Sequence, residues 1–391
     1  MSSQERTLPL RRARPWLLRH PWFVLGSLTL FALVAAFGNA WDLDWHVMIG
    51  RDTFWIPPHT MMYAAIALSG MLVAGVVLSG ILADPAEAGP PTLLGLRAPL
   101  GLVVLGLGVV QMTLAAPLDD WWHRMVGVDV TIWSPPHLIG FTGALVMLAG
   151  LTIAVLAQRH REGSARLDEA VSALRPGPRA LFWLTALLLA LSVRWLTFLN
   201  SASLQLSWAE EPDPYAVVGP WVGWWILWAS FAMSWTFVAS ARCWDDRPSW
   251  KLPLSVLLVT LALRLAEYFV SAAGFALVLP WGDQVLTEPF QIFLADLGLW
   301  VSTGVLILPV LAVAAMARWG RAWSPRTMGL AAGVAWGGLL ALQFALLRVA
   351  FDFAPFWSAG HAVALAVGLA AGVLGGLIGA AQGEWLRRPR H

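Results

Sequence analysis

Long apolar stretches alternate with short polar connections along the whole chain. Ten of these stretches approach or exceed the roughly 20 residues that a helix needs to cross the hydrocarbon core of a bilayer. Because a backbone inside lipid must satisfy its own hydrogen bonds, each stretch predicts a helix. The pattern therefore predicts an all-α, polytopic integral membrane bundle of about ten transmembrane helices. The stretches cover about residues 22–40, 59–82, 98–116, 136–157, 180–199, 218–241, 252–279, 289–316, 327–350 and 359–381.

The composition agrees with this prediction and excludes other classes. Of the 391 residues, 58% are apolar and 12% are charged, whereas a soluble domain has about 45–50% apolar and about 25% charged residues. A soluble globular enzyme and a disordered chain are both excluded. Cys243 is the single cysteine, which excludes disulfides and thiolate metal clusters. The formal net charge of +2 gives no reason to expect a nucleic-acid partner.

Lysine and arginine residues gather in alternate connections, and this sets the orientation. Of the 25, 20 lie before the first stretch, after the last one, or in the connections 83–97, 158–179, 242–251 and 317–326. Cytoplasmic loops of membrane proteins carry the excess of basic residues. We therefore expect both termini to be cytoplasmic, in a bacterial-type inner membrane.

The longest basic connection, 158–179, divides the chain into two membrane halves. The predicted organisation is a first half at 1–157, this cytoplasmic linker, and a second half at 180–391 with about six helices. The second half repeats the first only faintly, so a degenerate copy is one interpretation of it.

The first two outer connections are copies of one another. Asp42 and His46 recur 77 residues later as Asp119 and His123, and His59 recurs 78 residues later as His137. Glycine, aspartate, tryptophan and a Pro-Pro pair between these positions recur at the same offsets. Both copies have the same orientation, so the first four helices form a parallel repeat.

Each copy holds the ligand types of a reactive metal site. An aspartate and a histidine four residues apart lie on one face of a helix, and the second histidine follows Pro-Pro, which suits the first turn of the next helix. Two imidazoles and one carboxylate leave coordination positions open and suit copper, iron or zinc. The predicted ligands are Asp42, His46 and His59 in one set and Asp119, His123 and His137 in the other.

Other charged residues of these connections could orient the imidazoles by hydrogen bonds. The candidates are Asp44, Asp52, Asp120, Asp129 and Arg51. The alternative interpretation is that the acids are solvated and the histidines interfacial. Charged residues of the second half are predicted to form membrane ion pairs or a degenerate site; they are Arg264, Glu267, Asp296, Arg348, Asp352 and His361.

The first outer connection closely resembles a known metal-binding segment. It reads Asp42-Leu-Asp-Trp-His46, then Arg51-Asp52-Thr53, then Pro57-Pro58-His59. This segment is similar to the D-x-x-W-H, R-D-T and P-x-H motifs in the C subunit of the copper membrane monooxygenases. The resemblance implies copper at Asp42, His46 and His59. It covers about residues 22–155.

The second connection is similar to a second site of the same family. There the resemblance implies Asp119, His123 and His137 as ligands, with aspartate in place of the family's asparagine. The chain has no counterpart of the soluble cupredoxin-like domain of the family's B subunit.

The predicted function is therefore copper-dependent activation of O2 for oxidation of a small apolar substrate or ammonia. Iron and zinc remain alternative metals. The expected partners are the lipid bilayer, other membrane or periplasmic subunits, an electron donor and further copies of the chain. Two alternatives stay open: a non-catalytic copper binding, sensing or transport protein, and a zinc-dependent membrane hydrolase.

Overall fold

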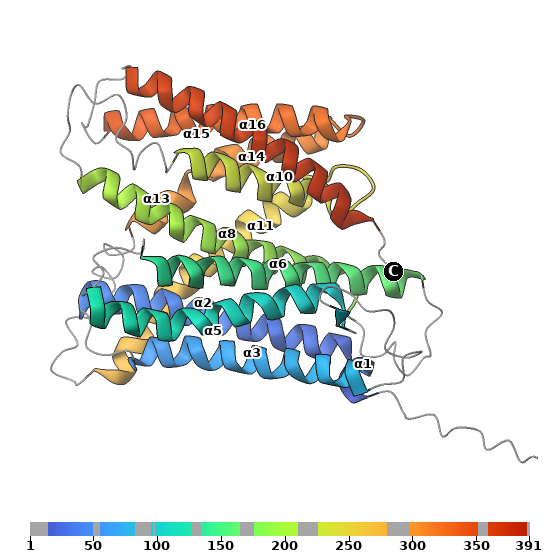
Figure 1. Ribbon diagram of the computed structural model, residues 1–391. Helices are drawn as coiled ribbons and strands as arrows, with labels where there is room; N and C mark the ends of the chain where they lie inside the picture. Colours follow the sequence, from blue (N-terminus) through green and yellow to red (C-terminus); the bar gives the residue numbers. More distant parts are fainter. Residues whose placement is uncertain are drawn as a thin grey trace, which may run out of the picture.

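A computed structural model describes residues 15–49, 55–82, 95–96, 98–126, 134–164, 176–209, 226–279, 297–350 and 359–388. Within these ranges the regular elements are helices, and nine of them are long and apolar enough to cross a membrane (Figure 1). The predicted all-α class is confirmed, and the chain is a multi-pass membrane protein. The helices are α1 (Trp16–Arg19), α2 (Pro21–Met48), α3 (Pro57–Leu82), α5 (Leu100–Val126), α6 (Pro135–Ser164), α8 (Pro178–Ala209), η2 (Ala229–Met233), α10 (Ser234–Arg242), α11 (Lys251–Val278), α13 (Leu297–Gly304), α14 (Ile307–Trp319), α15 (Pro325–Ala350) and α16 (Ala359–Arg387).

The nine helical spans correspond to nine of the ten predicted stretches. The sixth stretch, 218–241, is described from residue 226 onward, where the π-helical turn η2 leads into α10. In the eighth, α13 and α14 together form the span. The predicted linker 158–179 begins inside a helix, because α6 continues to Ser164.

Two helices extend well beyond their predicted apolar bounds. The first stretch was expected to end near residue 40 and the third near residue 116, whereas α2 continues to Met48 and α5 to Val126. The added turns are polar on one face, and a hydropathy pattern does not register them. These polar turns carry the aspartate and the first histidine of each predicted metal set.

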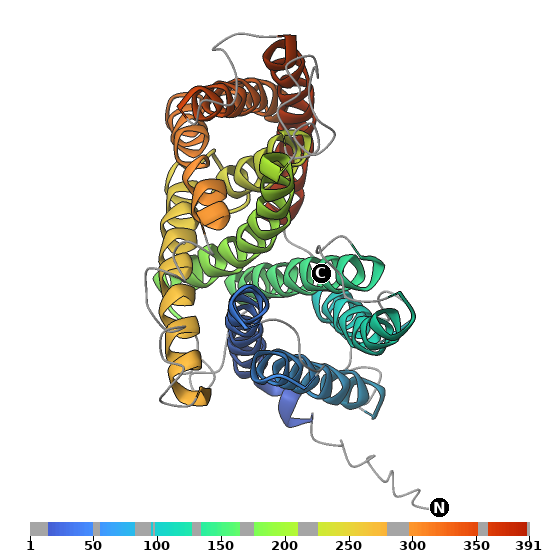
Figure 2. The same cartoon turned by 90° about the vertical axis from the view of Figure 1, so that its left-hand side faces the viewer.

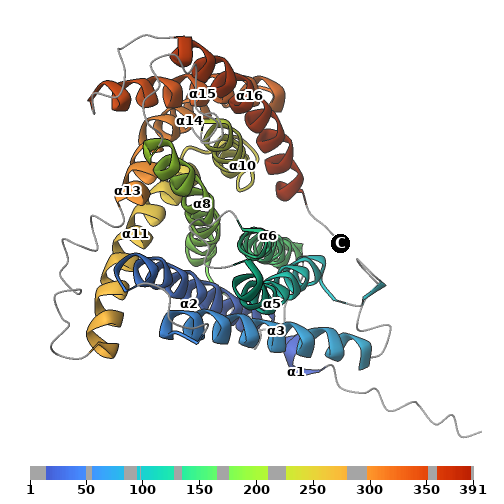
Figure 3. The same cartoon turned by 60° about the vertical axis from the view of Figure 1, so that its left-hand side comes forward.

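The helices form two groups joined in the middle. Figure 2 shows α2, α3, α5 and α6 on one side and α10, α14, α15 and α16 on the other. Helices α8 and α11 lie between the groups, where α8 contacts α6 and α11, and α11 contacts α2 (Figure 3). One apolar core therefore includes helices of both predicted halves. Helix α1 and the C-terminal end of α16 lie at the same end of the bundle (Figure 1).

Glycine allows the closest helix pairs to touch backbone to backbone. On α15, Gly329, Gly333 and Gly337 follow one another every four residues and face three glycines of α16. A Cβ at Gly329 would lie 2.7 Å from the carbonyl oxygen of Gly376. Such small-residue faces are a common basis of helix association in membranes.

A proline explains the break between α13 and α14. Pro309 has no N–H, so the carbonyl of Val305, four residues earlier, has no donor within its own helix. The side chain of Gln343 on α15 replaces that donor, with its Nε2 donating to the Val305 oxygen at 2.8 Å. A polar side chain in the membrane thus stabilises the interrupted helix.

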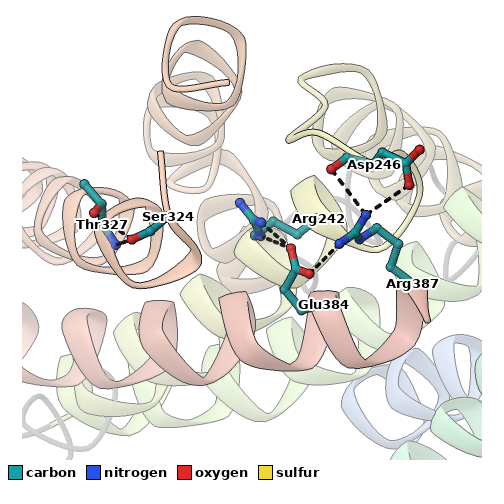
Figure 4. A network of polar contacts seen from close by, with 6 residues as sticks. All are labelled: Arg242, Asp246, Ser324, Thr327, Glu384 and Arg387. Carbon is teal, nitrogen blue, oxygen red and sulfur yellow. Dashed lines mark hydrogen bonds and ion pairs between the residues drawn. The ribbon is translucent and has the colours of Figure 1, made fainter. Parts of the chain in front are cut away.

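Polar contacts join the helix ends on the side of the bundle that holds the C-terminus. Figure 4 shows Glu384 of α16 between Arg242 of α10 and Arg387, and Arg387 also pairs with Asp246 at 3.0 Å. In the same view, the backbone N–H of Thr327 donates to the hydroxyl of Ser324 at 3.1 Å, which caps the start of α15. These contacts fix the ends of the second helix group.

Candidate metal centre

The first predicted set is built where α2 packs on α3. Gly38, Asp42 and His46 are spaced four residues apart and share a face of α2. A Cβ at Gly38 would lie 3.0 Å from the backbone nitrogen of Met62 on α3, so the missing side chain permits close approach. One and two turns further along α2, Asp42 and His46 therefore lie beside the beginning of α3.

His59 reaches the set because α3 begins at Pro57. The two prolines occupy the first turn, where their missing N–H groups leave no bond unmade. The carbonyl of Ile56 accepts from the backbone N–H of Thr60 at 3.0 Å and starts the helix. His59 is thus held within the first turn, and its side chain is 7% exposed.

The three side chains converge on one point. The Nε2 atoms of His46 and His59 lie 3.3 and 3.1 Å from the same oxygen of Asp42, Oδ1. One ligand atom from each residue lies within 4.8 Å of the others. An ion about 2.1 Å from each ligand atom would hold those atoms about 3.0–3.4 Å apart. The observed separations from Asp42 fit a bound metal ion with little movement.

An aromatic cluster shields one side of this set. Trp41 and Trp45 on α2 contact Phe275 on α11, with ring centroids 6.4 and 6.0 Å apart. All three rings are buried. His46 keeps 29% of its side chain exposed, so the set is buried on one side and open on the other. Sequence reasoning missed Phe275, because it lies more than 200 residues further along the chain.

Tyr63 is a second neighbour that the sequence did not single out. Its ring lies 6.0 Å from that of His59, edge to face. The spacing of four residues on α3 could have indicated this contact.

The second set is partly described. His137, at the start of α6, places Nε2 3.3 Å from Oδ1 of Asp119 on α5, which repeats the distance in the first set. Asp119 is buried, whereas His137 keeps 29% of its side chain exposed. His123 lies on α5 as predicted, but its side chain is outside the described residues.

The residues predicted to surround the two sets have different outcomes. Asp120 pairs with Arg124 at 2.9 Å near the surface, where 42% of Asp120 and 76% of Arg124 is exposed. Asp44 is buried, but it follows Asp42 by two residues and so faces another direction on α2. Arg51, Asp52 and Asp129 lie outside the described residues.

The predicted pair of Arg264 and Glu267 on α11 is confirmed. Nη1 of Arg264 lies 2.7 Å from Oε2 of Glu267, and both side chains are 1% exposed. The structure adds Arg194 of α8, whose Nε donates to Oε1 of Glu267 at 2.6 Å. Arg194 also donates to the side chain of Asn39 at 2.7 Å and to the carbonyl of Ala36 at 3.1 Å. Asn39 is one turn from Asp42 on α2.

The remaining charged residues of the second half cannot be placed at a site. Asp296 and Asp352 lie outside the described residues. Arg348 and His361 lie on α15 and α16, but the structure does not describe their side chains. The prediction of a degenerate site at these positions stays a prediction.

Comparison with known proteins adds no family to this picture. The chain matches no protein-family model, no curated protein and no solved structure. The argument for function therefore depends on the residues themselves.

Proposed function

We propose that the chain is a copper-binding membrane oxidoreductase, related to the C subunit of copper membrane monooxygenases, that activates O2 toward a small apolar substrate or ammonia. The observation that carries the proposal is the convergence of His46 and His59 on one oxygen of Asp42. Two imidazoles and a carboxylate leave coordination positions open, as a reactive metal site requires.

Bound copper would supply the redox chemistry with O2. The protein's own part is to hold and orient the ligands. Asp42 and His46 are held one turn apart on a single helix, and Pro57 and Pro58 fix the start of the helix that presents His59. The buried rings of Trp41, Trp45 and Phe275 exclude water from the side facing α11. An apolar substrate would approach through the lipid or along the exposed side of His46.

The pairing of Asp119 with His137 supports a second site of the same construction. By the distribution of basic residues, we place both sets toward the extracytoplasmic side of a bacterial inner membrane. An electron donor and partner subunits are part of this proposal, because the oxidation requires electrons.

The first test is metal content and EPR spectroscopy on the purified protein. We expect stoichiometric Cu(II) with nitrogen hyperfine coupling. Substitution of His46→Ala or His59→Ala should weaken copper binding by more than the roughly 10–100-fold that loss of an outer-shell group costs. The His20→Ala variant is the matched control, because His20 lies before α2, far along the chain from the set, and should retain the full copper signal.

The His123→Ala and His137→Ala variants test the second set in the same way. Retention of all copper in both would restrict the proposal to the first set. Stoichiometric zinc without an EPR signal would favour the hydrolase or a structural role. A protein that binds no metal at either set would contradict the proposal.

Catalysis needs a separate measurement. With a chemical reductant present, we expect O2 uptake by the copper-loaded protein to increase when a short hydrocarbon or ammonia is added. Uptake that is independent of every such substrate would leave a copper carrier or sensor as the better interpretation.

A further inference from the structure

A net positive charge is buried where α2, α8 and α11 meet. Arg194 and Arg264 share the single carboxylate of Glu267, and all three side chains are 1% exposed. Arginine stays protonated in proteins, so these three groups together carry one uncompensated positive charge. Arg264 is near the middle of α11, about 20 Å along the helix from either end at the usual rise per residue. A charge at that depth is costly unless it is neutralised.

The guanidinium of Arg264 also has hydrogen-bonding capacity to spare. Its Nε and Nη2 atoms are buried and have no hydrogen-bond partner among the residues that the structure describes. Its Nη1 lies 2.7 Å from Glu267, and this ion pair does not meet the angular criteria of a hydrogen bond. A buried donor without an acceptor costs about 1–3 kcal/mol, and more when it is charged.

A second buried group continues the same face of α11. Ser271 lies seven residues after Arg264 and four after Glu267, which puts it on their side of the helix. Its hydroxyl is fully buried and, within the described part of the chain, has no hydrogen-bond partner. The face therefore presents Arg264, with its unused donors, and one free hydroxyl to the interior.

We propose that this cluster binds one small monovalent anion, a halide or a carboxylate such as formate, at the Arg264 guanidinium. One negative charge neutralises the excess, whereas a dianion would leave a buried negative charge in its place. Nε and Nη2 are adjacent donors of one planar group and match a single acceptor atom or the two oxygens of a carboxylate. The anion site is distinct from the metal sets, and no metal ligand takes part in it.

The experiment is equilibrium binding of radiolabelled chloride to the purified protein, with sodium gluconate holding the ionic strength constant. We expect one chloride per chain, displaced by formate. The Arg264→Gln variant should lose binding by at least tenfold. The Glu267→Gln variant should bind chloride at least tenfold more tightly, because two arginines then lack a counter-charge. The Arg124→Gln variant removes an arginine from a surface pair and should bind as the wild type does.

Three further outcomes keep the proposal falsifiable. If Arg264→Gln does not fold, the Arg264→Lys variant keeps the charge and should still bind chloride. Absence of binding in the wild-type protein overturns the proposal. If binding then appears in the Asp296→Asn variant, an acid of the chain itself supplies the missing charge. Copper content in Arg264→Gln should equal that of the wild type, so this site and the proposed function can fail independently.

Discussion

Both candidate metal sets use a single carboxylate oxygen as the meeting point, yet they differ in access. In the first set His59 is nearly buried, and in the second His137 is about four times as exposed. An ion at the first set would exchange more slowly with solvent, because one of its two imidazoles is enclosed by α2 and α3. The two sets are therefore suited to different steps, although the sequence presents them as copies.

Cys243 gives a prediction at the scale of one residue. Burial raises the pKa of its thiol to about 12, so at pH 8 almost no thiolate is present to react. We expect maleimide to leave Cys243 unlabelled in the folded protein and to label it fully after denaturation in SDS. Since the native state favours the neutral thiol, its contribution to stability should fall as the pH rises from about 9 toward about 12. Rapid, complete labelling of the folded protein would contradict this burial.

The predictability of the sites follows from the range of their contacts. The Arg264 and Glu267 pair was predictable because both residues lie on one helix, three positions apart. The partners of Arg194 were not, because Asn39 is 155 residues earlier and Glu267 is 73 residues later. The metal sets were predictable because the duplicated spacing revealed which residues belong together.

At the scale of the helices, hydropathy predicted most of the fold, and side-chain chemistry set its details. The ends of α2 and α5 were missed because their last turns are polar on one face. The break before α14 was missed because it depends on Gln343 of another helix, which bonds the carbonyl that Pro309 leaves without a donor. Both features depend on contacts between helices that a single stretch does not contain.

Neighbouring glycines of α15 test the packing of α15 on α16. A Cβ at Gly337 would overlap the carbonyl oxygen of Gly368, whereas a Cβ at Gly338 would only touch the side chain of Leu369 at 3.7 Å. We expect Gly337→Ala to destabilise the protein by about 1–3 kcal/mol. Gly338→Ala is the matched control and should be neutral or stabilising by up to about 1 kcal/mol, because alanine is the better helix former. Unfolding in a denaturant series measures both, and equal effects would contradict the backbone contact.

At the scale of the whole molecule, the chain ends of the bundle lie together, as an even number of membrane crossings requires. The proposed orientation puts this end in the cytoplasm and the metal sets on the opposite side. The described helices already form one continuous core across both predicted halves. The halves are therefore not expected to fold as independent domains.

Single cysteines test that orientation in whole cells. Arg124 is exposed at the end of α5, and Arg326 is exposed in the first turn of α15. A membrane-impermeant maleimide should label the Arg124→Cys variant in intact cells and the Arg326→Cys variant only after the membrane is permeabilised. The reverse pattern would invert the topology. Cys243 is buried, so the wild-type chain serves as the unlabelled background.

The contacts of Arg194 also have a consequence for biosynthesis. The ribosome makes α8 before α11, so the arginine enters the bilayer 73 residues ahead of its carboxylate partner. Until then, Asn39 and the Ala36 carbonyl of α2 are the groups of this cluster that are already present to receive it. Helix α2 thus acts as a temporary host during insertion, and the arrival of α11 completes the neutralisation and closes the bundle.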